Sequence, residues 1–131
     1  MAIAAPDRRR RLGRWGEAAA AEFLRAQGLV VLASGYRCPR GEVDLVCREG
    51  RWLVFVEVKT RLSQAAGAPE EAVTVAKQRR VAAAAHHFLL QHRLYGVPYR
   101  FDVVAVDVGL VEGMPALPRI RHHRNAFTPP A

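Results

Sequence analysis

The segment RWLVFVEVKTR at residues 51–61 constrains the fold more than any other feature of this chain. Its valines, leucine and phenylalanine fall on both alternating faces, so a strand built from it has to be covered on both sides. Segments rich in β-branched and aromatic residues precede it at 29–37 and 42–48, and others follow at 99–108 and 118–122. The sequence therefore predicts a central β-sheet whose middle strands are buried.

Two segments have the residue spacing of helices that could cover such a sheet. Residues 14–27 are rich in alanine and are followed by Gly28, a residue typical of helix C-termini. Residues 74–92 place Val81 and Phe88 on one apolar stripe. The order of a helix, three strands, a helix and one or two strands predicts an α/β fold, in which a mixed central β-sheet is flanked by α-helices.

The length of the chain bounds its domain organisation. Its 131 residues fit one domain, since domains commonly contain about 100–200 residues. We expect this domain to span residues 14–127. Residues 1–13 include four consecutive arginines without apolar periodicity, which predicts a flexible basic arm, available to a phosphate backbone or simply solvated. Residues 128–131 are expected to form a loose tail.

Basic residues outnumber acidic residues in this chain. The chain has 20 Lys and Arg against 12 Asp and Glu, a net charge of +8, which favours a polyanionic partner such as DNA. The two cysteines form no CxxC pair, and no segment approaches the roughly 18 apolar residues of a membrane span. We therefore expect a soluble cytoplasmic protein without a membrane partner. The absence of a glycine-rich phosphate loop excludes a P-loop nucleotide hydrolase.

Three basic clusters carry the predicted nucleic-acid contacts. The first belongs to the N-terminal arm, the second precedes the strand at 42–48, and the third opens the helix at 74–92. As separate runs they could be solvated faces, but together they surround an acidic segment. The predicted contacts are Arg8, Arg9, Arg10, Arg11, Arg14, Arg37, Arg40, Lys77, Arg79 and Arg80.

A hairpin brings two of the acidic side chains together. A two-residue turn at Glu49–Gly50 would join the second and third strands and place Asp44 opposite Phe55. Asp44 then lies diagonal to Glu57 on the same face, with the backbones about 7–8 Å apart, and Lys59 points to that face as well. Two carboxylates at this separation can close around one divalent ion.

The burial of charge among valines favours a metal site. Burying Glu57 and Lys59 costs several kcal/mol per ion unless they are paired or bind a metal. A Glu57–Lys59 ion pair is the simpler interpretation, but residues two apart on a strand are poor partners, and the pair leaves Asp44 unexplained. We therefore favour Mg²⁺ or Mn²⁺ held by Asp44, Glu57 and the backbone carbonyl of Val58. Lys59 would orient or activate a water for attack on a phosphodiester.

The pattern Asp44, then Glu57-Val58-Lys59, resembles the D…ExK signature of the restriction-endonuclease-like, or PD-(D/E)xK, superfamily of metal-dependent nucleases. More closely, the chain resembles the YraN-like bacterial family over about residues 13–127. The segments that carry this resemblance are GEAAAAEFL, GYRCPRGEVDLV, VFVEVKTR, AVTVAKQRR and RFDVVAV.

The resemblance implies a restriction-endonuclease-like fold and a set of site residues. A similar architecture occurs in archaeal Holliday-junction resolvases, whose first-helix acid matches Glu17. The strand acids match Asp44 and Glu57, and the lysine matches Lys59. Gln78 resembles a glutamine that some members of the superfamily place near the metal.

Two classes of function are compatible with these residues. The first is a metal-dependent DNA endonuclease, similar to Holliday-junction resolvases, which hydrolyses phosphodiester bonds. The alternative is a non-catalytic nucleic-acid-binding protein with the same fold. A branched junction needs two symmetric cuts, so the resemblance carries the expectation of a homodimer. For two further acids, Glu42 and Asp102, we favour structural roles with nearby hydrogen-bond donors.

Overall fold

The computed structural model describes residues 5–62 and 73–130. Two long helices and seven strands occur in these ranges, and the central strands lie close to their predicted positions. The elements are α1 (Ala5–Ala26), β1 (Val30–Cys38), β2 (Gly41–Glu49), β3 (Trp52–Leu62), α2 (Val75–Gln91), β4 (Tyr99–Val108), β5 (Leu110–Val111), β6 (Met114–Pro115) and β7 (Arg119–His123).

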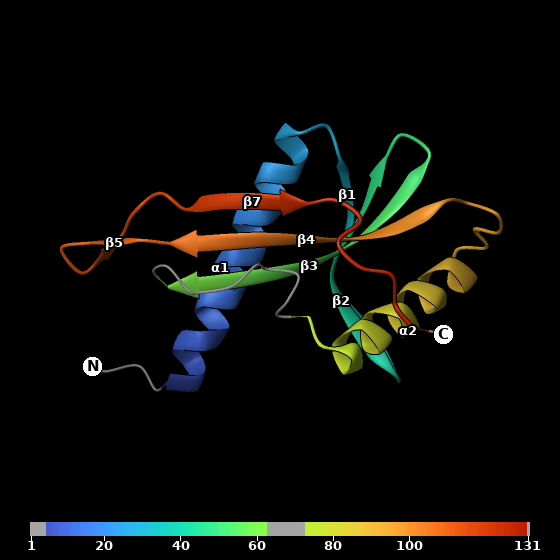
Figure 1. The fold of residues 1–131 in the computed structure, drawn as a ribbon, viewed down its shortest axis with the longest axis horizontal. Coiled ribbons are helices and arrows are strands. Elements are labelled where there is room, and N and C mark those ends of the chain that lie inside the picture. Colours follow the sequence, from blue (N-terminus) through green and yellow to red (C-terminus); the bar gives the residue numbers. More distant parts are fainter. Residues whose placement is uncertain (1–4, 63–72, 131) are drawn as a thin grey trace.

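Five strands form one mixed sheet in the order β1-β2-β3-β4-β7. β3 and β4 are parallel, and the other neighbouring pairs are antiparallel. Figure 1 shows β3, β4 and β7 side by side and the β1–β2 hairpin turning away from them. The predicted fold class is confirmed: the chain has an α/β fold with a mixed sheet flanked by helices, consistent with a nuclease-like architecture. The small β5–β6 hairpin was not predicted.

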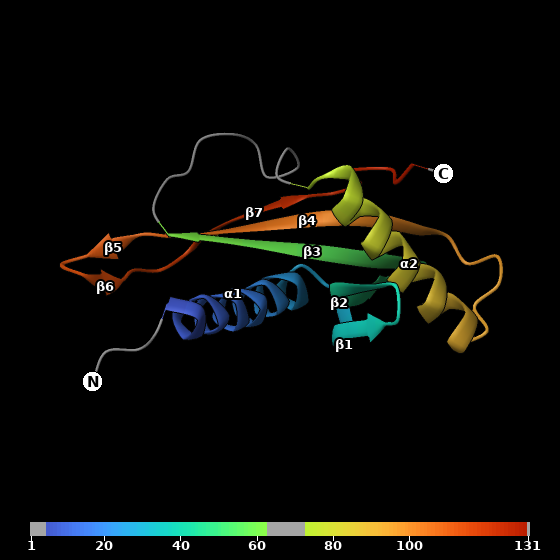
Figure 2. The ribbon, with the colours of Figure 1, turned by 90° about the horizontal axis from the view of Figure 1, so that it is seen from below.

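Each face of the sheet packs against one helix, and two apolar cores result. α1 lies under β3 and β4, and α2 covers the opposite face near β1 and β2 (Figure 2). The first core, on the α1 side, includes Ala20, Leu24, Leu45, Val56 and Val104. The second core, on the α2 side, includes Val43, Val46, Phe55, Val81, Phe88 and Phe101.

α1 begins at Ala5 and not at Arg14, so the prediction of a flexible arm is wrong for residues 5–13. Pro6 is favourable in a first helical turn, and Asp7 is favourable near the positive end of a helix dipole. The four arginines that follow are good helix formers, which apolar periodicity alone does not detect. Residues 1–4 lie outside the described ranges.

The β2–β3 hairpin has a different register from the predicted one. Glu49 pairs with Trp52 and Leu45 with Val56, so the turn residues are Gly50 and Arg51. Gly50 has φ 59°, which a glycine adopts readily at the first position of a hairpin turn. Placing Asp44 opposite Phe55 was therefore wrong. The shift is an even number of residues, so the side chains of the paired residues, from Leu45 to Glu49 and from Trp52 to Val56, stay on their predicted faces.

Candidate functional site

The strand β2 departs from β3 at Asp44. The pairing between the two strands ends at Leu45–Val56. Just beyond this pair, the Asp44 Oδ2 atom accepts a hydrogen bond from the Val58 N–H at 2.8 Å. The Asp44 carboxylate therefore takes a backbone donor of β3 beyond the end of the ladder.

A break in side-chain alternation turns β2 at this point. Val43 belongs to the core on the α2 side, whereas Leu45, two residues later, belongs to the core on the α1 side. Regular alternation would place both on one face. On the neighbouring strand, Gly35 lies between the residues that pair with Leu45 and Val43, and its φ of 61° lets β1 follow the bend.

Glu57 is the most deeply buried acid of the site. Its residue is 1% exposed, its Oε2 atom lies 3.3 Å from Lys77 Nζ, and its Oε1 atom is buried without a hydrogen-bond partner among the described residues. Burial, followed by the negative charge of Asp44, raises the pKa of Glu57 to about 7, although Lys77 acts in the opposite direction. An extra positive charge at this position would stabilise the ionised carboxylate.

Glu17 reaches the same place from α1. Gly16 lets the helix approach β3 closely, because a Cβ atom on Gly16 would lie 1.8 Å from the Thr60 Oγ1 atom. Burial is the main cause that raises the pKa of Glu17 to about 7, with further contributions from the charge of Asp44 and a hydrogen bond to it. The carboxylates of Glu17, Asp44 and Glu57 therefore repel one another when ionised.

Lys59 lies beside these acids, as does Lys77. A shallow cavity of about 350 Å³, here called the site cavity, opens where the first helix, the β2–β3 fork and the start of α2 meet. The residues that line it are Leu12, Gly13, Glu17, Asp44, Val58, Lys59, Thr60 and Lys77. Of the predicted site residues, Glu17, Asp44 and Lys59 therefore line one cavity, whereas the buried Glu57 is not among its lining residues and lies behind Lys77, which contacts it.

Lys77 is a site residue whose position sequence reasoning missed. It was predicted as a nucleic-acid contact, but it stands over Glu57 in the first turn of α2, where its N–H donates to the Thr74 side chain that caps the helix. A signal was present in the sequence: Lys77 lies one helical turn before Val81, on the apolar stripe that faces the sheet. Gln78, by contrast, does not line the site cavity, because its side-chain amide donates to the Val73 carbonyl at 3.1 Å.

Glu42 has the structural role that we favoured. It forms ion pairs with Arg37 at 3.3 Å and Arg80 at 3.5 Å. These contacts hold two predicted basic residues near the acids of the site, since the charges of Glu42 and Arg37 both act on the Glu17 carboxyl. Of the remaining basic residues, Arg8 and Arg9 lie in α1, and the exposed ones are Arg10, Arg11, Arg14, Arg40 and Arg79.

The donor set fits a hard divalent cation. Among residues 5–62 and 73–130, no three His, Cys, Asp or Glu side chains are arranged to hold a metal ion. Mg²⁺ does not require such a set, because it commonly binds through one or two carboxylates and keeps several waters. Asp44 and Glu57 provide two carboxylates, and the unpartnered Oε1 atom of Glu57 is an oxygen that a cation could satisfy.

Asp102 belongs to a separate structural network. This fully buried carboxylate accepts hydrogen bonds from Arg100 Nε at 3.0 Å and the Asn125 N–H at 2.8 Å, and lies 2.7 Å from His122 Nε2. The network lowers the pKa of Asp102 despite the opposing effect of burial. Both of its oxygens have partners, so the favoured structural role of Asp102 is confirmed.

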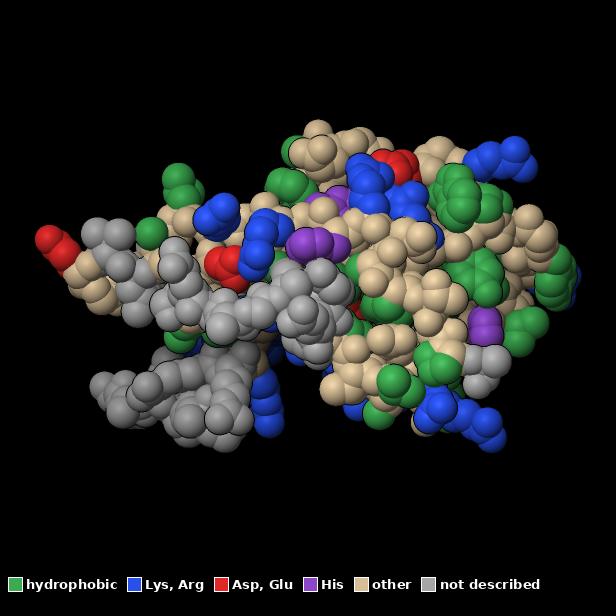
Figure 3. Space-filling view, in the orientation of Figure 1, with side chains coloured by type: hydrophobic (Ala, Val, Ile, Leu, Met, Phe, Trp, Pro, Cys, Tyr) green, Lys and Arg blue, Asp and Glu red, His purple; other side chains and the backbone are tan. Residues whose placement is uncertain are grey.

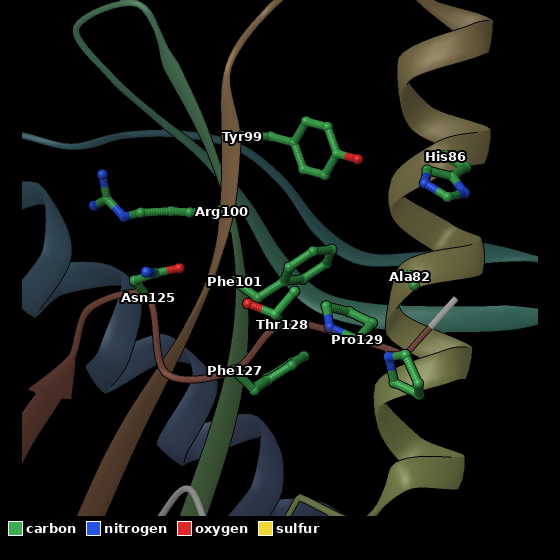
Figure 4. Close-up of a pocket in the computed structure, with 10 residues that line it drawn as sticks. Ala82, His86, Tyr99, Arg100, Phe101, Asn125, Phe127, Thr128 and Pro129 are labelled. Carbon is green, nitrogen blue, oxygen red and sulfur yellow. The ribbon is translucent and has the colours of Figure 1, made fainter.

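A second cavity of about 350 Å³ lies elsewhere on the sheet. Figure 4 shows Tyr99 and Phe101 directed toward α2, while Arg100 points the other way. Thr128, predicted to be in the loose tail, lines this cavity together with Phe127. Tyr99 pairs with Leu53 at the start of β3, about 20 Å along the strand from Lys59, so this cavity is separate from the site cavity.

None of the helices in the described ranges is long and apolar enough to cross a membrane.

Known proteins match this chain over most of its length. The model of the uncharacterised protein family UPF0102 matches residues 16–106. A UPF0102 protein of Anaeromyxobacter dehalogenans is 50% identical over 121 residues, which cover 92% of this chain and 87% of that protein.

Other relatives carry the same family description. A UPF0102 protein of Syntrophotalea carbinolica is 52% identical over 95 residues, covering 72% of this chain and 77% of that protein. One of Roseiflexus castenholzii is 50% identical over 104 residues, covering 79% and 84%. The matched region contains the C-terminal half of α1, which carries Glu17, the β2–β3 fork and α2. The expected family is thereby confirmed: this chain belongs to the UPF0102, or YraN-like, family.

Proposed function

We propose that this protein is a divalent-metal-dependent DNA endonuclease, with Mg²⁺ or Mn²⁺ held by Asp44, Glu57 and the carbonyl oxygen of Val58. The observation that carries the proposal is the buried Oε1 atom of Glu57, which lacks a partner beside two further carboxylates. Such an arrangement costs stability, because burial and the charge of Asp44 both disfavour the ionised Glu57 carboxylate and the Lys77 contact only partly compensates. A bound cation would remove that cost.

The cation would neutralise charge on the scissile phosphate and lower the pKa of the attacking water. The surrounding side chains have separate roles. The Glu17 carboxyl lies beside Asp44 in the site cavity, and its pKa of about 7 lets it hold a proton next to that carboxylate. The Lys59 ammonium, half-buried in the site cavity, donates to a phosphate oxygen or orients the water. The Lys77 ammonium stabilises the ionised Glu57 carboxylate and adds positive potential to the site.

The surrounding charge supports a nucleic-acid substrate. Carboxylates repel a phosphodiester, so a nuclease of this kind needs cations around its acids. The net charge of +8 and the exposed arginines of α1, next to the site cavity, provide them. DNA that is branched, cut symmetrically by a homodimer, is the substrate and assembly that we propose from the resemblance to junction resolvases.

A cleavage panel tests this proposal. Labelled four-way junctions, flaps, single strands and duplexes are incubated with Mg²⁺ or Mn²⁺ and either the wild type, Asp44→Asn or Lys59→Met. We expect cleavage to fall at least about 100-fold in both variants. DNA binding should hold or tighten in Asp44→Asn, since a negative charge is lost. Glu22→Gln, an exposed acid of α1, is the matched control and should cut like the wild type.

Two results of the panel would contradict the proposal. If Asp44→Asn and Lys59→Met cut as well as the wild type, the activity comes from a contaminating nuclease. If the wild type binds every substrate and cuts none of them with either metal, the protein is the non-catalytic nucleic-acid-binding protein of our alternative.

A further inference from the structure

The strand register places three arginines, Arg61, Arg119 and Arg121, near Lys59, and the sequence-based predictions did not include them. Lys59 of β3 pairs with Ala105 of β4, and Ala105 pairs with Arg121 of β7. Directly paired residues project to the same face of a sheet, so Lys59 and Arg121 flank the small side chain of Ala105. They lie two strands apart, about 10 Å at the backbone.

A second row continues the first. Arg61 pairs with Asp107, and Asp107 pairs with Arg119. Along a strand, residues two apart project to the same face at a spacing of about 7 Å. The two rows therefore form one patch of four cations and one carboxylate, here called the β3–β7 basic face, made up of Lys59, Arg61, Arg119, Arg121 and Asp107.

This patch lies on the face opposite α1. Val58 packs into the core on the α1 side, so the side chains of Lys59 and Arg61 project to the other face. Figure 2 shows α1 below β3, β4 and β7, while α2 lies to one side, over β1 and β2. Figure 3, viewed from the side opposite α1, shows Lys and Arg side chains beside an acidic one over the region of β4 and β7.

The hydrogen-bonding capacity of the patch is only partly used. Arg121 Nη2 donates to Asp107 Oδ2 at 2.9 Å. Arg61 Nη1 and Arg121 Nε have no hydrogen-bond partner among the described residues. The exposed Arg119 forms no ion pair within them. One carboxylate therefore faces four cations. The two unpartnered nitrogens are themselves buried, so an external acceptor would meet the exposed Arg119 and the solvent-facing atoms of the half-buried cations.

We propose that the β3–β7 basic face binds the phosphate backbone of the DNA strand that continues from the site cavity. This inference rests on the proposed function and extends it by naming the surface that holds the substrate beyond the scissile bond. Lys59 belongs to both the cavity and the face, so a strand leaving the site meets Arg121 and Arg61 next. Guanidinium groups suit this role because their fork of donors matches phosphate oxygens.

The test measures how the affinity for DNA depends on salt. Binding of a fluorescein-labelled 30-base-pair duplex is followed by anisotropy between about 50 and 200 mM KCl, with EDTA present to prevent cleavage. Each phosphate contact adds about 0.9 to the slope of log K against log salt. The double variant Arg119→Gln/Arg121→Gln should therefore reduce the magnitude of this slope by about two. Asp107→Asn removes the one carboxylate of the face and should tighten binding.

A matched control removes the same charge elsewhere. Arg51, at the β2–β3 turn, lies about 26 Å along β3 from Lys59, and Arg93 follows α2. Both are exposed and form no ion pair in the described ranges, so Arg51→Gln/Arg93→Gln should change the slope by less than about half a unit. Arg119→Gln alone, which breaks no ion pair, should reduce the slope by about one and guards against misfolding of the double variant.

The outcomes separate the two proposals. If the wild type binds DNA with a steep salt dependence and both double variants change the slope equally, or neither does, the assignment of this face is wrong while the proposed function stands. If the wild type does not bind DNA at all, the proposed function itself fails. A slope reduced only in the Arg119 and Arg121 variants supports the inference.

Discussion

Replacing Glu57 by glutamine should make the metal-free protein more stable at pH 8. The change keeps the size of a buried side chain and removes a charge that burial and Asp44 both disfavour. Because the pKa of Glu57 is raised from 4.5 to about 7, its ionisation costs the folded state about 3 kcal/mol once the pH exceeds 7. That pKa already includes the favourable Lys77 contact, but the glutamine amide adds buried donors that need partners, which offsets part of the gain, so we expect a net stabilisation of about 2 kcal/mol.

The direction of the pKa shift determines how the stability difference between variant and wild type changes with pH. A raised pKa means that folded Glu57 holds its proton to higher pH than unfolded Glu57, so the wild type loses stability as the pH rises from about 4.5 to 7. Glutamine does not ionise, so Glu57→Gln does not lose this stability as the pH rises. Its advantage should therefore be near zero at pH 4.5 and reach its full value at pH 8, where it corresponds to a rise of roughly 6 °C in melting temperature.

Thermal unfolding followed by circular dichroism in EDTA, at pH 4.5 to 8, measures the difference. Mg²⁺ or Mn²⁺ at millimolar concentration should then raise the melting temperature of the wild type and leave that of Glu57→Gln unchanged. Glu22→Gln, which alters an exposed acid of α1, should behave like the wild type throughout. If Glu57→Gln is less stable than the wild type at pH 8, the Lys77 ion pair already satisfies the carboxylate and our reasoning is refuted.

Three other perturbations test the geometry. Gly16→Ala should lower both the melting temperature and the rate of cleavage, because the new Cβ atom would lie 1.8 Å from Thr60 Oγ1. Gly13→Ala is the matched control: its Cβ atom would have no neighbour within 4 Å, so both measurements should stay at the wild-type value. Asp102→Ala should destabilise the fold by roughly 3 kcal/mol in urea titrations, because it leaves buried donors without an acceptor; a change below about 1 kcal/mol would contradict this. The lowered pKa of Asp102 also means that its stabilisation, present above its unfolded pKa, is lost on acidification, so wild type and Asp102→Ala should converge in stability at low pH.

The sequence predicted the elements of the fold that depend on apolar pattern. β3 is apolar on both faces, and α2 has a clear stripe at Val81 and Phe88, so tertiary packing and local pattern agree there. The start of α1 was missed because its first turns are determined by arginine propensity and Pro6, which carry no apolar period.

The predicted acids converge on one site, but the way in which they converge was not predictable from pairing rules. A regular hairpin would place Asp44 on the face of Glu57, whereas the structure turns β2 at Asp44 and directs its carboxylate to the Val58 N–H. The signal for this bend is Gly35 on the neighbouring strand, and it depends on a β1–β2 register that the sequence alone does not determine. Lys77 was missed as the partner of Glu57 because we assigned the basic cluster that contains it to nucleic-acid contacts.

Diffraction from crystals soaked in Mn²⁺, recorded where manganese scatters anomalously, tests the central claim most directly. The account predicts a strong anomalous peak between the carboxylates of Asp44 and Glu57, and its loss in crystals of Glu57→Gln soaked in the same way. A wild-type crystal with the site open to solvent and no peak there at saturating Mn²⁺, or with peaks only at other acids, would contradict the assignment of this site as a metal centre.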